Sequence, residues 1–85
     1  MKLYLISQDE ENGCDTYDSA VVAAESEEIA RNIDPSKDGQ LITEAEWNKF
    51  YGSWCNKPEL VTVRYLGEAV EGTEQSVICA SFNAG

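Results

Sequence analysis

The sequence contains no histidine, few basic residues and no long apolar run. Its 85 residues include 6 lysines and arginines against 16 aspartates and glutamates, which gives a formal net charge of −10. The absence of histidine excludes Ser-His and Cys-His nucleophile systems and removes the commonest metal ligand. Because so acidic a chain repels phosphate groups, we expect no direct binding to nucleic acid or to an anionic membrane.

Cysteine is sparse and its spacing carries no motif. Cys14, Cys55 and Cys79 form no C-x-x-C pair, which excludes a zinc ribbon and a thioredoxin-type site. Three reduced thiols in a cytoplasmic protein is the simplest interpretation, and one disulfide with a remaining thiol is the alternative. The apolar run at residues 2–6 is too short for a signal peptide or a membrane span.

The sequence predicts neither an enzyme nor a metal or cofactor site. No glycine-rich phosphate loop is present. With 16 acids, any chosen carboxylate pair is weak evidence for glycoside hydrolysis, and an 85-residue chain has little room for a substrate cleft. An EF-hand with Gly13 at its sixth position would place Gln8 first and Ser19 twelfth, where carboxylates are required, so that pattern fails. We therefore expect no catalytic residue, no cofactor and no metal ligand.

Apolar runs separated by turn residues predict one domain, residues 1–85, of the α+β class. The expected strands are Lys2–Ser7, Ser19–Ala24, Leu60–Leu66 and Ser76–Phe82. Ser26, followed by two glutamates, has the pattern of a helix N-cap, and Asp34-Pro35 would end that helix. We expect a small antiparallel sheet of about four strands with one or two short helices packed on one face.

An aromatic segment in the middle of the chain follows a capping box. Thr43 and Glu46 have the spacing of that motif. The aromatic residues then recur at helical spacing, at Trp47, Phe50, Tyr51 and Trp54. We favour a helix, and an aromatic strand or loop is the alternative. Such a cluster is more often core than interface, although two tryptophans on one segment also suit a binding hot spot or a homodimer contact.

Acidic residues are concentrated near the N-terminus. Residues 9–28 hold half of the 16 acids and no lysine or arginine. Charges this close act together over a Debye length of about 8 Å and can steer a basic protein surface, while a solvated face is the simpler alternative. The candidate partner-binding residues are Asp9, Glu10, Glu11, Asp15, Tyr17, Asp18, Glu27, Glu28, Trp47 and Trp54.

Three segments carry a resemblance to other proteins. Residues 2–8 (KLYLISQ), 17–28 (YDSAVVAAESEE) and 80–85 (ASFNAG) resemble a group of small phage and bacterial proteins to which no activity is assigned. The resemblance implies a phage-type accessory protein acting in the host cytoplasm. By analogy, it suggests an inhibitor of host defence, of the anti-CRISPR or DNA-mimic type, whose partner is a host nuclease or nucleoprotein complex. The alternatives are a homo-oligomeric accessory protein and a small cation- or ligand-binding domain.

Overall fold

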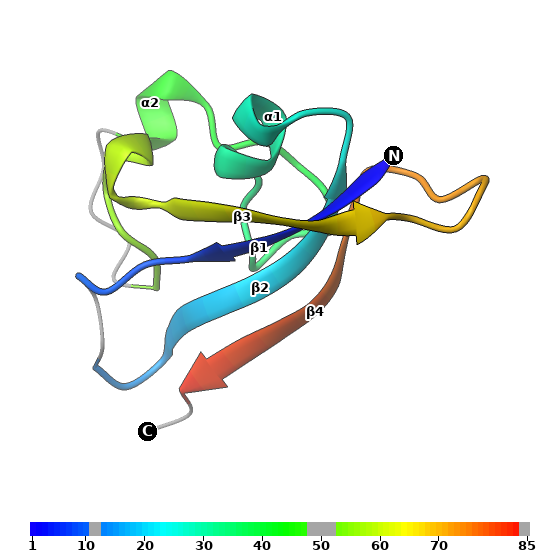
Figure 1. The fold of residues 1–85 in the computed structure, drawn as a ribbon. Helices are drawn as coiled ribbons and strands as arrows, with labels where there is room; N and C mark the ends of the chain where they lie inside the picture. The colour runs from blue at the N-terminus through cyan, green and yellow to red at the C-terminus, as the bar shows by residue number, and fades with distance from the viewer. Residues whose placement is uncertain (11–12, 48–52, 84–85) are drawn as a thin grey trace.

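Four strands and three short helical segments make up the computed structural model, which describes residues 1–10, 13–47 and 53–83 (Figure 1). In chain order the elements are β1 (Lys2–Ser7), β2 (Thr16–Ala24), α1 (Glu27–Arg31), α2 (Glu44–Trp47), the 3-10 helix η1 (Pro58–Leu60), β3 (Thr62–Glu68) and β4 (Ser76–Asn83). The predicted order of elements and the α+β class are confirmed.

The strands form one antiparallel sheet in the order β3-β1-β2-β4. Strands β1 and β2 occupy the centre, with Lys2 opposite Ala24 and Ser7 opposite Ser19. The connection from β3 to β4 runs from one edge of the sheet to the other past the start of β1, where the Ala69 N–H donates to the Met1 carbonyl at 3.0 Å. The two edges of the sheet are therefore β3 and β4.

Alternate residues of the central strands build the core. Tyr4 and Ile6 of β1 lie opposite Val22 and Ala20 of β2, and all four side chains are buried. They form one cluster with side chains from the end of β2, α1, α2 and the connections, namely Ala24, Ala30, Ile33, Trp47, Trp54, Cys55 and Val61. On the other face, Leu3, Leu5 and Val21 are half-buried. The run of apolar residues in β1 predicts a strand buried on both faces or nearly so, but burial is complete on one face only.

The helix caps form as the sequence predicts. The Ile29 N–H donates to Ser26 Oγ at 3.2 Å, which caps α1. At α2, the Thr43 N–H donates to Glu46 Oε1 at 3.0 Å and the Glu46 N–H donates to Thr43 Oγ1 at 3.2 Å, which completes the capping box. Both motifs are local, so the spacing of a few residues is enough to specify them.

Several predicted boundaries differ from the structure. The strand predicted from Leu60 begins at Thr62, because Pro58–Leu60 forms a 3-10 helix, with Pro58 at a position where the missing N–H costs nothing. That strand also continues through Gly67, whose φ of 148° is accessible to glycine, beside a register shift between Leu3 and Tyr4.

The predicted aromatic helix is described only in part. Helix α2 is described over Glu44–Trp47, Phe50 and Tyr51 lie outside the described residues, and Trp54 belongs to a bend. The prediction that Trp54 lies on the face of that helix is wrong. Its side chain nevertheless reaches the core, because burying an indole is favourable from any backbone conformation.

The loop before α2 packs directly on the start of β4. Gly39 has a φ of +81°, and a Cβ added there would lie 2.3 Å from the Gln75 carbonyl oxygen. The Gln75 Nε2 also donates to the Gly39 carbonyl at 2.6 Å. Glycine at this position therefore satisfies two requirements, a left-handed backbone and a close approach.

Gly39→Ala should destabilise the protein more than Gly72→Ala. Gly72 also has a positive φ, of 89°, but nothing lies within 4 Å of a Cβ added there, so its variant reports backbone strain alone. Because the alanine at residue 39 also clashes with backbone, we expect the free energy of unfolding to fall by about 2 kcal/mol more. Urea unfolding followed by circular dichroism measures both variants, and equal losses would contradict the close approach.

Candidate functional site

Strand β2 divides the acidic run 9–28 between opposite ends of the sheet. The strand holds 9 residues, which span roughly 25 Å. Asp9, Glu10 and Asp15 are exposed and Asp18 is half-buried at the end where β1 turns into β2, which we call the hairpin end. Glu25, Glu27 and Glu28 are exposed at the other end, which we call the helix end. The structure therefore does not form the single acidic surface that the sequence suggested, and Glu11 lies outside the described residues.

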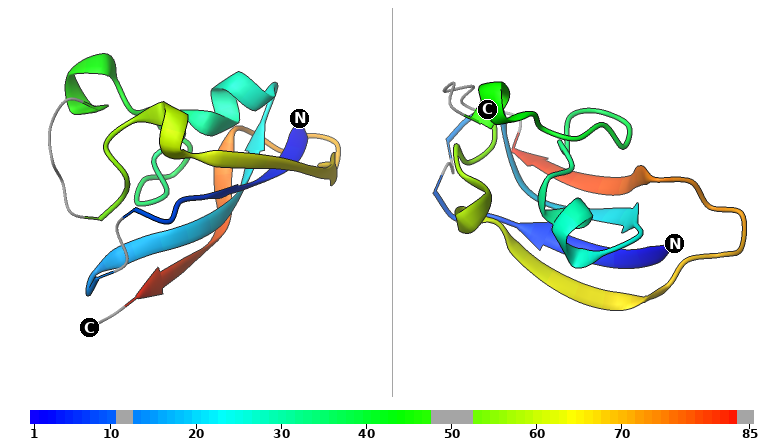
Figure 2. Two further views of the ribbon diagram at one scale, coloured as in Figure 1. Left: turned by 60° about the vertical axis from the view of Figure 1, so that its left-hand side comes forward. Right: turned by 90° about the horizontal axis from the view of Figure 1, so that it is seen from above.

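The helix end gains three acids that the sequence reasoning missed. Glu68 ends β3 opposite Lys2, while Glu71 and Glu74 lie on the connection that crosses this end of the sheet toward β4 (Figures 1 and 2). All three are exposed. They are more than 40 residues from Glu25 in the chain, and only the antiparallel pairing of β3 with β1 brings them to the same end. A strand prediction that included pairing order would have found them.

Few cations compensate these carboxylates. Between described residues the ion pairs are Arg31–Glu27, at 3.7 Å, and Lys37–Glu46, at 3.4 Å. Lys2, at the helix end, directs its Nζ to the Glu25 backbone carbonyl at 3.3 Å. Exposed ion pairs of this kind are weak, so both ends of the sheet keep a negative potential that extends into solvent.

Two of the three predicted aromatic anchors are buried rather than presented at the surface. Trp47 and Trp54 are 8% and 5% exposed, respectively, and both belong to the core. Tyr17 is half-buried at the hairpin end, where its ring packs on Phe82 with centroids 4.7 Å apart. Of the predicted aromatic contacts, only Tyr17 is half-buried rather than buried.

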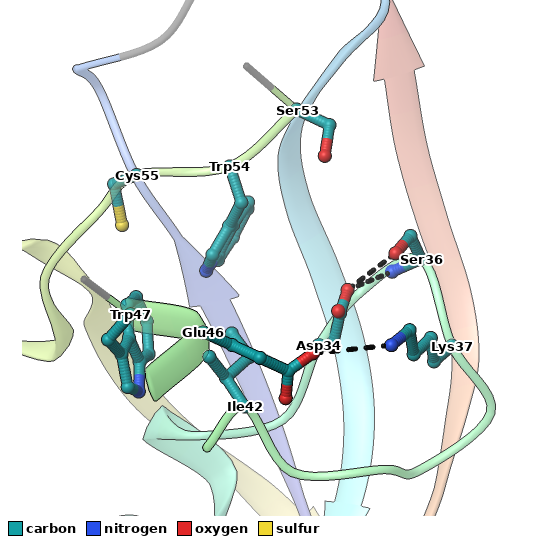
Figure 3. Close-up of a pocket in the computed structure, with 9 residues that line it drawn as sticks. All are labelled: Asp34, Ser36, Lys37, Ile42, Glu46, Trp47, Ser53, Trp54 and Cys55. Carbon is teal, nitrogen blue, oxygen red and sulfur yellow. Dashed lines mark hydrogen bonds and ion pairs between the residues drawn. The ribbon is translucent and has the colours of Figure 1, made fainter. Parts of the chain in front are cut away.

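A hollow beside α2 contains the two indoles and several polar side chains (Figure 3). Its wall is apolar at Ile42, Trp47, Trp54 and Cys55, and its polar members are Asp34, Ser36, Lys37, Glu46 and Ser53. The Trp47 Nε1 donates to Asn32 Oδ1 at 3.0 Å, whereas the buried Trp54 Nε1 has no hydrogen-bond partner among the described residues. The two tryptophans are thus similar in burial but different in hydrogen bonding.

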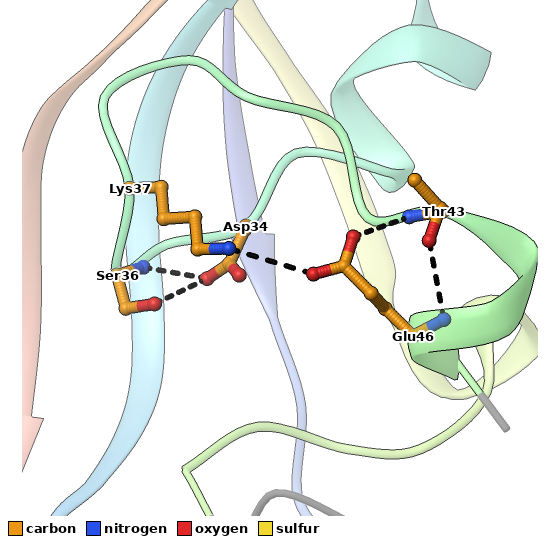
Figure 4. A network of polar contacts seen from close by, with 5 residues as sticks. All are labelled: Asp34, Ser36, Lys37, Thr43 and Glu46. Atoms are coloured by element: carbon orange, nitrogen blue, oxygen red, sulfur yellow. Dashed lines mark hydrogen bonds and ion pairs between the residues drawn. The ribbon is translucent and has the colours of Figure 1, made fainter. Parts of the chain in front are cut away.

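The carboxylates around the hollow serve the local fold (Figure 4). Asp34 Oδ1 accepts from the Ser36 N–H at 2.9 Å and from Ser36 Oγ at 2.6 Å. The pKa of Glu46 is lowered, first by the hydrogen bond from the Thr43 backbone N–H and next by the Thr43 side chain. Desolvation opposes these two effects, and Lys37 adds a smaller lowering of the pKa. Each carboxylate therefore works as a hydrogen-bond acceptor in a turn or a cap.

Metal-ligating side chains do not gather in the described part of the chain. Within residues 1–10, 13–47 and 53–83, no group of three or more Cys, Asp or Glu side chains is arranged to hold a metal ion. Cys14 and Cys79 are exposed, Cys55 is buried, and none of the three is in a disulfide.

The comparisons with known proteins assign no family. No family model, no curated protein and no solved structure matches the chain. No helix among the described residues is long and apolar enough to cross a membrane. The function is therefore inferred from the charges, edges and contacts described above.

The two tryptophans should differ in what their indole N–H groups contribute to stability. Trp47→Phe removes a bonded donor and leaves Asn32 Oδ1 unpaired, whereas Trp54→Phe removes a donor that has no described partner. Because the change in side-chain volume is the same, we expect Trp47→Phe to lower the free energy of unfolding by about 1 kcal/mol more. Urea unfolding of the two variants tests this. A larger loss for Trp54→Phe would show that its N–H donates to a group outside the described residues.

Proposed function

We propose that the protein is a non-enzymatic binding module that presents carboxylates to a basic surface of another protein. The observation that carries the proposal is the excess of exposed acids at both ends of the sheet, which the few neighbouring cations do not offset. Such a field raises the rate of encounter with a cationic surface and repels anionic competitors. In this proposal the two helices cover one face of the sheet, and the ends and edges of the sheet remain available to the partner.

The partner's basic surface is proposed to be of the kind that normally holds nucleic-acid phosphates. Carboxylates separated by roughly 25 Å along β2 can meet two groups of lysines and arginines on one extended groove. The sequence resemblance favours a phage-encoded inhibitor that occupies a host nuclease or nucleoprotein complex in the host cytoplasm. Anti-CRISPR and DNA-mimic proteins are the class to which this proposal assigns the chain.

Binding to a basic partner should weaken steeply as salt rises. For a partner isolated from a nuclease-treated bacterial lysate on immobilised protein, we expect the dissociation constant to rise at least about tenfold between 50 and 300 mM NaCl, because salt screens the attraction between the exposed acids and the cations of the partner. Titration calorimetry at the two salt concentrations measures it. An affinity that is unchanged by salt would exclude the proposed mode of binding.

Two matched sets of substitutions show which end of the sheet the partner contacts. The first neutralises the hairpin end at Asp9, Glu10, Asp15 and Asp18, and the second neutralises the helix end at Glu25, Glu28, Glu71 and Glu74. Each set changes the net charge by the same amount, so a general effect of charge cancels in the comparison. At least one set should weaken binding about tenfold at 50 mM NaCl, and full binding by both would place the interface elsewhere.

A further inference from the structure

The two edges of the sheet differ in charge. Strand β3 carries Arg64 and Glu68, and Tyr65 Oη donates to Glu68 Oε2 at 2.6 Å. Strand β4, together with Gln75 before it, carries no charged residue, although the chain has a net charge of −10. Proteins commonly protect an edge strand with charged side chains, because its unpaired N–H and C=O groups can pair with another chain. By this criterion β3 is protected and β4 is not.

The open part of β4 is long enough to accept another strand. Every residue from Ile78 to Phe82 is exposed, with Ile78 at 51% and Phe82 at 45%. The loop that contains Gly39 contacts the chain at Gln75 and Ser76, before this stretch begins. The register of β4 against β2 shifts twice: Ile78 is the extra residue on β4, and Asp18 is the extra residue on β2, opposite Ser81 and Phe82. Within Cys79–Asn83, β4 therefore has no inserted residue of its own.

Acids flank this uncharged edge at both of its ends. At the C-terminal end of β4, the N–H of the exposed Asp15 donates to the Asn83 carbonyl at 2.6 Å. At the other end, Glu74 lies two residues before the strand, and Asp38 precedes the Gly39 that packs on Gln75. All three carboxylates belong to exposed residues. The edge is therefore an uncharged track of roughly 25 Å with a negative charge at each end.

We propose that β4 binds an extended segment of the basic partner as a fifth strand of the sheet. Main-chain hydrogen bonds to β4 would supply the pairing, as in other cases of strand addition. The segment would carry uncharged, β-branched residues opposite Ile78–Phe82 and a lysine or arginine at each end, facing Asp15 and Glu74. This inference rests on the proposed function and adds the backbone conformation of the partner and the surface that it contacts.

Charge argues against a second copy of the chain at this edge. In antiparallel self-pairing, Asp15 of one copy would lie near Glu74 of the other, and in parallel self-pairing each acid would lie near its own equivalent. Either orientation brings like charges together at both ends of the pair, in addition to the repulsion between two chains of net charge −10. A segment with basic ends would instead be attracted to the acids at both ends of β4.

Three synthetic peptides separate strand pairing from charge attraction. The first has two lysines at each end and alternating threonine and valine over five central positions. The second keeps the lysines and places proline at two of the central positions, which removes main-chain donors. The third replaces every lysine with glutamate. Each peptide carries a fluorescent label and is titrated with the protein at 50 mM NaCl, with anisotropy as the readout.

We expect the first peptide to bind roughly tenfold more tightly than the proline peptide, because the latter cannot form all of the main-chain hydrogen bonds, and the glutamate peptide should not bind measurably. If the two lysine peptides bind within twofold of each other, strand addition is wrong while the proposed function stands. If neither lysine peptide binds, the proposed function fails as well. A dimer in light scattering would assign the edge to a second copy and overturn the inference.

A matched pair of protein variants locates the peptide. Asp15→Asn with Glu74→Gln removes the acids beside β4, and Glu27→Gln with Glu28→Gln removes two acids on α1, which contacts β1, β2 and β3. Both variants change the net charge equally. The first should weaken binding of the lysine–threonine–valine peptide at least about fivefold and the second less than twofold. Equal losses would show that the acids flanking β4 do not hold the peptide and would overturn its placement.

Discussion

The antiparallel pairing of β1 with β2 is the interaction on which the rest of the structure depends. Its register places Tyr4 and Ile6 opposite Val22 and Ala20, so one face of the sheet becomes the core. The same pairing turns a continuous acidic run into two groups at opposite ends of β2. Because β1 and β2 fill the centre, β3 and β4 become the edges, and their different charges become a property of the surface.

This arrangement lets a chain of net charge −10 fold around a small apolar core. Most acids of the described residues lie in loops, at strand ends and on short helices, where water solvates them, and the central strands keep Val, Ile and Ala for packing. A consequence is that β4 lacks the charged side chains that usually protect an edge. The acids that would discourage pairing with another acidic copy would at the same time attract a basic segment.

Local features of the fold could be predicted from the sequence, and features that depend on pairing could not. The caps at Ser26 and Thr43 follow from spacings of three residues, and the strands follow from apolar runs. The position of Glu68, Glu71 and Glu74 at the helix end could not be predicted, because it depends on the strand order, which no local pattern encodes. The spacing of Trp54 predicts a place on a helix face, but its burial comes from tertiary packing around a bend.

The central claim is that the β4 edge pairs with an extended segment of the partner. Amide hydrogen exchange of the isotope-labelled protein tests this most directly, because it reports main-chain pairing residue by residue. In the free protein, the outward-facing amides between Cys79 and Phe82 should exchange fast. Addition of the lysine–threonine–valine peptide should slow them at alternate positions while leaving β3 unchanged. Exchange in β4 that stays fast under saturating peptide, or slowing confined to Thr62–Glu68, would contradict an account in which the uncharged β4 edge receives the partner.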